Sequence, residues 1–68
     1  MTSQQVERFS LTHQTCVVRV MSTLGDFTGR VAGVRFDRSE RRQCLRLLEG
    51  ARVARSIPVH TIRALSAE

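Results

Sequence analysis

The sequence predicts a mainly β domain, a small barrel of five short strands with a possible short N-terminal helix. Three observations favour this fold class. Apolar and polar residues alternate along several short stretches, which is typical of half-buried strands. Glycines lie between or within these stretches, where turns and bends are expected. The chain has 68 residues, which corresponds to a single domain, and we expect the barrel to cover residues 14–66.

Residues 2–12 are expected to form a short helix before the barrel or, alternatively, a frayed tail. Thr2 and Gln5 fit a capping box, in which the threonine caps the helix and the glutamine reaches back to it. Val6 and Phe9 are three residues apart and would share one helical face. A helix this short is stable only when it packs on something.

The central stretch, residues 16–37, predicts a β-hairpin. In its first strand, Cys16, Val18 and Val20 alternate with Val17, Arg19 and Met21. β-Branched residues at period two favour a strand over a helix. Residues 22–26 break the pattern, and Gly25 allows the positive φ that hairpin turns commonly need.

The second strand, from Phe27 to Phe36, is expected to bend at Gly29 and Gly33. Its two faces would be Phe27, Gly29, Val31 and Gly33, and Thr28, Arg30, Ala32, Val34 and Phe36. Both sets contain apolar residues, so each face is expected to be buried over part of its length. Glycine within a strand often marks a bulge or a corner. Two glycines without a special role in an ordinary hairpin are the alternative.

The rest of the chain predicts three more strands. Residues 37–42 contain no apolar residue and are expected to form a solvated loop. Residues 43–49 predict a strand with Leu45 and Leu47 facing inward; a helix over 38–48 is the competing interpretation, since its residues favour helices. We prefer the strand because Gly50 and Ala51 follow at a turn position.

Residues 52–57 alternate again, which predicts a fourth strand with Val53 and Ile57 on one face. Pro58 is expected to end this strand, because proline cannot donate to a β-ladder. Residues 59–61 would then make a tight turn, residues 62–65 a closing strand, and residues 66–68 a frayed end.

Neither metal binding nor catalysis is indicated by the polar residues. Cys16 and Cys44 lie far apart, and they form no metal-ligand spacing with His13 or His60. We expect both cysteines to be reduced packing residues within strands, and we expect no cofactor. The acidic residues fall mostly at loops or ends, with Asp26 in a turn, so no acid–base constellation is apparent. We therefore expect that the protein is not an enzyme.

The net charge of +5 comes from arginine, because all 11 basic residues are arginines. Either a GC-rich genome favours its codons, or its planar guanidinium is wanted to pair with phosphates and stack on bases. The N-terminus lacks the apolar region of a signal peptide, and no apolar run is long enough to cross a membrane. We expect a cytoplasmic location.

A candidate nucleic-acid site lies around the second and third strands. Six arginines fall within this short span: Arg30, Arg35, Arg38, Arg41, Arg42 and Arg46. If the loop between the strands projects from one rim, their guanidinium groups would form a positive patch for phosphates. The chain has no Trp or Tyr, and its three phenylalanines are expected to be core residues. Binding should therefore be mostly electrostatic, unless these charges are only a solvated face.

The order of these segments resembles an Sm-like small β-barrel, with the content of an SH3-like barrel. The resemblance covers roughly residues 3–66 and rests on FTGRVAGV, the charged loop, CLRLLEG and SIPVHTIRAL. The chain is similar to the bacterial RNA chaperone Hfq in the spacing of helix, glycine-bent strand and closing strand. In Hfq a lysine–histidine pair before the last strand holds uridine-rich RNA. Here His60 matches that histidine, whereas Val59 occupies the lysine position.

The chain is also similar to small Rho-binding antiterminators of the Rof type, which are protein-binding inhibitors. The leading expectation is thus a regulatory module that binds nucleic acid, RNA more than DNA, through the six arginines and His60. The alternative is a protein-interaction module that regulates transcription through a strand edge or the N-terminal helix. Because a 68-residue core is marginal and Sm-type barrels close rings through their fourth and fifth strands, we expect a homo-oligomer.

Overall fold

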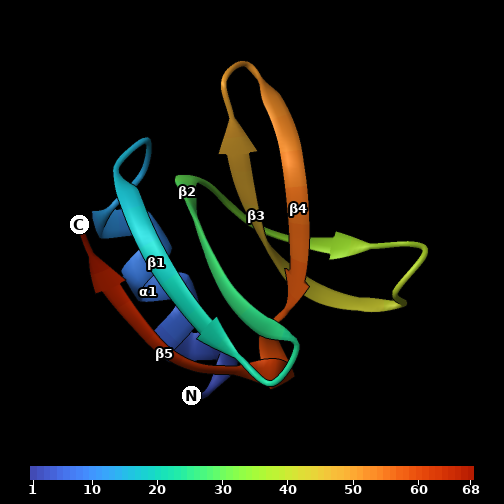
Figure 1. Ribbon diagram of the computed structural model, residues 1–68. Helices are drawn as coiled ribbons and strands as arrows, with labels where there is room; N and C mark the ends of the chain where they lie inside the picture. The colour runs from blue at the N-terminus through green and yellow to red at the C-terminus, as the bar shows by residue number, and fades with distance from the viewer.

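The computed structural model describes the backbone of residues 1–68 and the side chains of all residues except 53 and 54. The predicted orientation of Val53 lies outside the described side chains. The elements are α1 Ser3–Thr12, β1 Val17–Ser22, β2 Gly25–Asp37, β3 Arg42–Glu49, β4 Arg52–Pro58, the 3-10 helix η1 Val59–Thr61 and β5 Ile62–Ala67 (Figure 1). The strands form one open antiparallel sheet in the order β4-β3-β2-β1-β5. The predicted mainly β fold with an N-terminal helix is confirmed.

Helix α1 is held by its N-terminal cap and by its buried face. Thr2 Oγ1 accepts a hydrogen bond from Gln5 N at 3.2 Å, and Gln5 Oε1 accepts one from Thr2 N at 2.9 Å. Val6 is fully buried in the core, and Phe9 packs against the core from the same face. The predicted capping box is confirmed, and the frayed-tail alternative is wrong.

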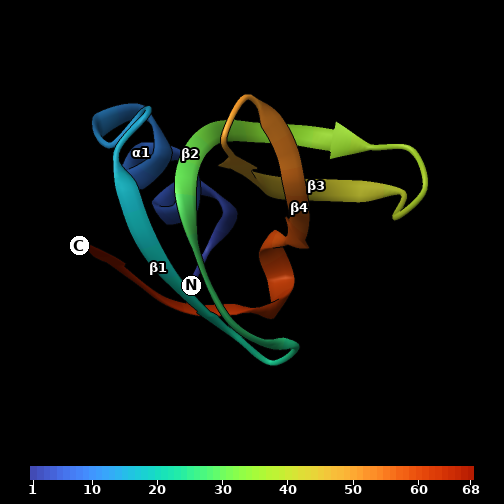
Figure 2. The same cartoon turned by 45° about the horizontal axis from the view of Figure 1, so that its top comes forward.

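Strand β2 is shared between the two halves of the sheet. Its first half pairs with β1, and its second half pairs with β3 from Arg30 to Asp37. Between Val31 and Gly33 the register shifts, and Gly33 has a φ of +134°. Figure 2 shows β2 curving from its position beside β1 into its position beside β3. The irregularity predicted at the glycines is confirmed at Gly33, whereas Gly29 pairs in regular register with Val18.

The bulge changes which residues of β2 face the core. Val31 is buried, but beyond the bulge it is Val34 that packs against the core cluster. Ala32 has no partner in the β2–β3 register, so one residue is added to the alternation. The predicted faces, which assumed uninterrupted period-two alternation, are therefore wrong beyond Val31. The expectation that each set would be buried over part of its length is confirmed, because Val31 belongs to one set and Val34 to the other.

The predicted environments of the phenylalanines are confirmed for two of three. Phe9 and Phe27 are partly buried against the core. Phe36, which was expected in the core, is 59% exposed, so that prediction is wrong. Phe36 lies beyond the bulge and opposite Gln43 near the outer end of the β2–β3 hairpin. The outer end of this hairpin projects away from the other strands (Figure 1).

The later elements follow the expected order with longer strands. Residues 42–49 form β3 with Leu45 and Leu47 buried, so the competing helix is wrong. Gly50 makes the turn into β4 with a φ of +67°. Pro58 ends β4, and η1 provides the predicted tight turn.

Two segments differ from their predicted local structure. Ser66 and Ala67 belong to β5, where Ala67 pairs with Val18, and Glu68 N donates to Val17 O at 3.1 Å. The predicted frayed C-terminal end is therefore wrong. Asp26 lies in β2 and not in a turn, and its carboxylate forms an ion pair with Arg19 at 3.1 Å.

The two cysteines lie in different environments, although both are free thiols. Cys44 is fully buried in β3, as predicted. Cys16 is exposed and precedes β1, so its predicted place as a packing residue within a strand is wrong. Burial raises the pKa of the Cys44 thiol above its ordinary value, and the negative charges of Asp37 and Glu40 add to the effect.

The thiols should differ sharply in reactivity, because the reactive species is an accessible thiolate. We expect a disulfide reagent such as dithionitrobenzoate to modify one thiol per chain rapidly in the native protein and two in denaturant. The variant Cys16→Ser should lose the fast phase, whereas Cys44→Ala should keep it. Equal fast modification of both thiols in the native protein would contradict the buried position of Cys44.

Candidate nucleic-acid interface

Three open surface pockets adjoin one another beside α1, the outer parts of β2 and β3, and η1. The His60 pocket has a volume of about 440 Å³ and is lined by Met1, Ser3, Arg41, Arg42, Gln43, Val59 and His60. The Glu7 pocket, of about 450 Å³, is lined by Ser3, Glu7, Val34, Arg35, Phe36 and Gln43. The Arg46 pocket, of about 380 Å³, is lined by Arg35, Phe36, Asp37, Arg38, Ser39 and Arg46.

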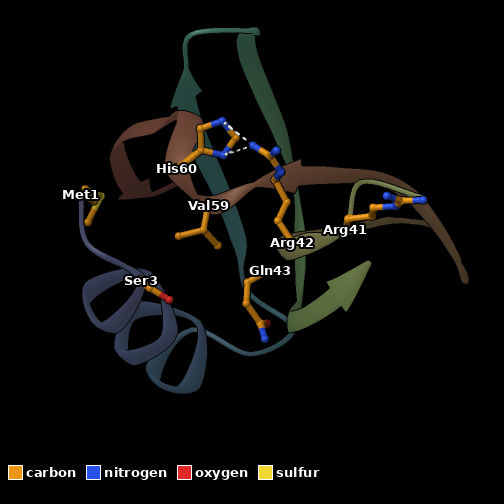
Figure 3. A pocket seen from close by; sticks show the side chains of 7 residues that line it. All are labelled: Met1, Ser3, Arg41, Arg42, Gln43, Val59 and His60. Atoms are coloured by element: carbon orange, nitrogen blue, oxygen red, sulfur yellow. Dashed lines mark hydrogen bonds between the residues drawn. The ribbon is translucent and has the colours of Figure 1, made fainter. Parts of the chain in front are cut away.

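The His60 pocket is organised by a contact between Arg42 and His60 (Figure 3). Arg42 Nη1 lies 3.0 Å from His60 Nε2 and 3.2 Å from His60 Nδ1. Arginine can only donate, and a neutral imidazole has one acceptor nitrogen, so one of these hydrogen bonds forms at a time. Arg42 Nε also donates to Glu40 O at 3.2 Å. The guanidinium is therefore fixed from two sides and keeps N–H groups for a ligand.

Arg41 is positioned by the backbone and not by a side-chain partner. Its φ is +57°, the left-handed region in which a residue other than glycine is strained. Arg41 N donates to Asp37 O at 2.7 Å, which closes the turn between β2 and β3. In Figure 3 the Arg41 side chain extends away from the His60 ring, along the outer side of the pocket.

Asp37 holds the turn that carries these arginines. Its Oδ1 accepts hydrogen bonds from Ser39 Oγ at 2.6 Å, Ser39 N at 2.9 Å and Glu40 N at 3.2 Å. The hydrogen bond from the Ser39 hydroxyl, followed by that from Glu40 N, holds the pKa of Asp37 below its ordinary value. All three hydrogen bonds come from residues of the same turn, so the Asp37 carboxylate stabilises the loop that carries the arginines.

The lining of the Arg46 pocket includes three arginines and Phe36. Arg35 and Phe36 come from the end of β2, Arg38 from the turn, and Arg46 from β3, where it pairs with Gly33. Arg35 and Arg38 are exposed and Arg46 is half-buried. The guanidinium groups offer charge for phosphate, and the exposed ring offers a surface for stacking.

Arg30 lies apart from the other predicted site residues. It lines a fourth pocket between the β1–β2 and β3–β4 hairpins, together with Asp26, Glu49 and Arg55. Arg55 stacks over the Phe27 ring at 4.6 Å from its centroid. The acidic groups reduce the positive potential there, so this pocket is a weaker candidate for phosphate.

The structure thus divides the seven predicted site residues into three groups. Arg35, Arg38 and Arg46 line the Arg46 pocket; Arg41, Arg42 and His60 line the His60 pocket; Arg30 stands alone. Residues that the sequence did not single out complete the surface: Ser3, Glu7, Phe36 and Gln43. The helical period of α1 could have placed Ser3 and Glu7 on one face, since they are four apart. For Phe36 the signal would have been its place directly before the charged loop of residues 37–42, at the outer end of the hairpin.

Other kinds of site are less evident in the part of the chain that the structure describes. Its residues contain no group of three or more His, Cys, Asp or Glu side chains that could hold a metal ion. Among the described helices, none has the length and apolar character needed to cross a membrane. In comparisons with known proteins, the chain matched no family model, no curated protein and no solved structure.

Proposed function

We propose that this protein is a small nucleic-acid-binding regulatory module that acts through its arginine-lined pockets. The observation that carries the proposal is the Arg46 pocket, whose lining includes three arginines and an exposed phenylalanine. The net charge of +5 favours approach to a polyanion. The resemblance to Sm-like barrels favours RNA over DNA.

The arginines of this pocket suit phosphate because none of them forms an ion pair with an acidic side chain among the described residues. The ion pair present among the described residues joins Arg19 to Asp26, on β1 and the first half of β2. Asp37, the acid that lines the pocket, is bound to the N–H and hydroxyl groups of its own turn. Each arginine can therefore offer several N–H donors to phosphate oxygens.

Replacing Arg35 and Arg38 together by glutamine tests the proposal. Both side chains are exposed, so we expect an unchanged melting temperature. Binding to a fluorescent single-stranded RNA should weaken, and the slope of log affinity against log salt should flatten by about 0.7 for each lost phosphate contact. Fluorescence anisotropy at several salt concentrations measures both quantities.

The matched control is Arg30→Gln with Arg63→Gln, which removes the same charge from exposed positions outside the three pockets. We expect this control to change affinity less and to leave the salt slope nearly unchanged. Equal effects of the two double variants would mean that binding depends on the net charge of the protein and not on the Arg46 pocket. No binding by the wild-type protein at low salt would refute the proposal.

A homo-oligomer is part of the proposal. The sheet order leaves β4 and β5 each with a single neighbouring strand, and an open edge can pair with another chain. Light scattering at micromolar concentration should give a mass that is a multiple of 7.7 kDa. A monomer would contradict a ring.

The same open edges favour a second candidate function, a protein-interaction module that regulates transcription. Strand addition requires exposed main-chain donors and acceptors, which β4 and β5 offer at the edges of the sheet. A pull-down from the native host with and without nuclease separates the two functions. A partner protein that is retained after nuclease treatment favours this second candidate, whereas loss of the captured material favours nucleic acid.

A further inference from the structure

We infer that the Glu7 pocket holds the base of an unpaired nucleotide and favours bases that carry an exocyclic amino group over uracil. This inference rests on the proposed function and concerns the ligand of the same surface. Three features carry it: the continuity of the three pockets, the order of charges along them, and the hydrogen-bonding groups of the Glu7 pocket.

The three pockets follow one another along the surface, since neighbouring pockets share lining residues, and we call this row of pockets the track. Ser3 and Gln43 line both the His60 and the Glu7 pocket. Arg35 and Phe36 line both the Glu7 and the Arg46 pocket. Each pocket holds about 380–450 Å³. An extended chain with several units therefore fits the track better than one small molecule does.

The net charge of the middle pocket differs from that of the two end pockets, and this order suits single-stranded nucleic acid. The His60 pocket at one end contains Arg41 and Arg42, and the Arg46 pocket at the other end contains Arg38 and Arg46. The middle pocket contains both the Glu7 carboxylate and Arg35, so its charges offset each other, whereas arginines outnumber acids at the two ends. Phosphates are therefore attracted more strongly to the two ends, and the middle pocket is suited to a base.

Phe36 gives that base a surface on which to stack. Its ring is 59% exposed and lies at the junction of the middle pocket and the Arg46 pocket. Every base has a π-face that stacks on an aromatic side chain. In a duplex both faces are already covered by neighbouring base pairs, so the ring selects unpaired nucleotides.

The Glu7 carboxylate determines which bases are favoured. An ionised carboxylate only accepts hydrogen bonds, and it pairs well with the amino group of cytosine. Adenine and guanine also carry an amino group, whereas uracil presents two carbonyl oxygens beside a single N–H. Gln43, which lines the same pocket, can donate to the neighbouring ring nitrogen or carbonyl. This preference differs from the uridine-rich RNA that the resemblance to Hfq implies.

The test compares two labelled RNA 12-mers, oligocytidine and oligouridine, at pH 7.5 and one salt concentration. We expect the wild-type protein to bind oligocytidine about fivefold more tightly, as for one net hydrogen bond. Glu7→Gln should bring the two affinities close together, because an amide does not discriminate between a donor and an acceptor.

Glu40→Gln is the matched control. It removes the same negative charge from the turn between β2 and β3, and Glu40 lines none of the three pockets. We expect it to strengthen binding to both oligonucleotides while leaving their ratio unchanged. If Glu7→Gln behaves in the same way as Glu40→Gln, or if the wild-type protein shows no preference, the assignment of Glu7 is overturned.

Phe36→Leu tests the stacking part with a side chain of similar apolar character. We expect affinity for both oligonucleotides to fall about fivefold or more, because one stacked base is lost. Leu24→Ala, at a 63% exposed position in the β1–β2 turn, should change neither affinity. An unchanged affinity of Phe36→Leu would overturn the stacking assignment.

These results can be told apart from failure of the proposed function. If no RNA binds, or if the arginine variants bind as well as the wild type, the proposed function fails. If binding depends on Arg35 and Arg38 but is indifferent to Glu7 and Phe36, the module binds phosphates and the base pocket is refuted.

Discussion

Gly29→Val is expected to lower the free energy of unfolding by about 3 kcal/mol, at the upper end of the range for overpacking. A Cβ atom at Gly29 would lie 3.1 Å from Leu48 O and 3.2 Å from Leu47 Cβ. The first neighbour is backbone within the sheet, and the second belongs to a buried core side chain. Neither can move aside without disturbing the β2–β3 pairing. Thermal denaturation followed by circular dichroism measures the loss.

Substitutions at two other glycines distinguish the effect of steric crowding on stability from the effect of backbone conformation. Gly33 has open space around it but a φ of +134°, so Gly33→Val should cost about 1–3 kcal/mol through backbone strain. Gly50 also has open space, and its φ of +67° is one that asparagine tolerates. Gly50→Asn should therefore leave the melting temperature nearly unchanged. A native-like melting temperature for Gly29→Val would contradict the close packing of β2 on β3.

Val6→Asp is expected to reduce stability by about 3 kcal/mol or more, because a carboxylate would replace a fully buried side chain without gaining a partner. Val6 is the buried apolar residue of α1, and the core cluster around it includes residues of all five strands. Either the helix leaves the sheet or the charge remains in the core. Chemical denaturation gives the loss, and the far-ultraviolet spectrum reveals whether α1 unfolds.

Leu11→Asp is the control on the same helix. It introduces the same charge and the same helix propensity at a side chain that is 66% exposed. We expect a change of no more than about 0.5 kcal/mol, as for an ordinary surface substitution. Similar losses in Val6→Asp and Leu11→Asp would mean that the helix itself, and not its docking, is sensitive to the charge.

The sequence predicted the features that depend on local chemistry. Thr2 and Gln5 identified the helix cap, since both capping hydrogen bonds lie within one turn. Gly29 and Gly33 identified the irregular part of β2, because a missing side chain and a positive φ are properties of single residues. Gly50 and Pro58 marked the turn after β3 and the end of β4.

Features that depend on register could not be predicted in the same way. One extra residue at the β2 bulge reverses the side of the sheet that each later residue faces. The packing of Val34 against the core depends on this shift, whereas Phe36, two residues further along on the same side of β2, is exposed because it lies near the outer end of the β2–β3 hairpin. The extension of β5 to Ala67 depends on pairing with β1, which lies far away in the sequence.

The sequence predicted only part of the candidate site, because the rest of the site also depends on strand register. A span of six arginines was visible in the sequence, but its division between pockets required the register of β2 and β3. Arg30 precedes the bulge and pairs with Leu48, whereas Arg35 follows it and pairs with Cys44. Glu7 lies near the arginines because α1 docks beside β2 and β3. This docking is a tertiary contact, so the local sequence of β2 and β3 could not predict it.

The position of β5 at the edge beside β1 has a consequence for the kinetics of folding. The pairs β1–β2, β2–β3 and β3–β4 join strands that follow one another in the sequence. The pair β1–β5 joins the first strand of the chain to the last. Closing a long loop costs entropy before its contacts form, so β5 is expected to dock after the rate-limiting barrier. Substitutions in β5 should then accelerate unfolding and leave the folding rate almost unchanged, whereas substitutions in the β2–β3 hairpin should slow folding.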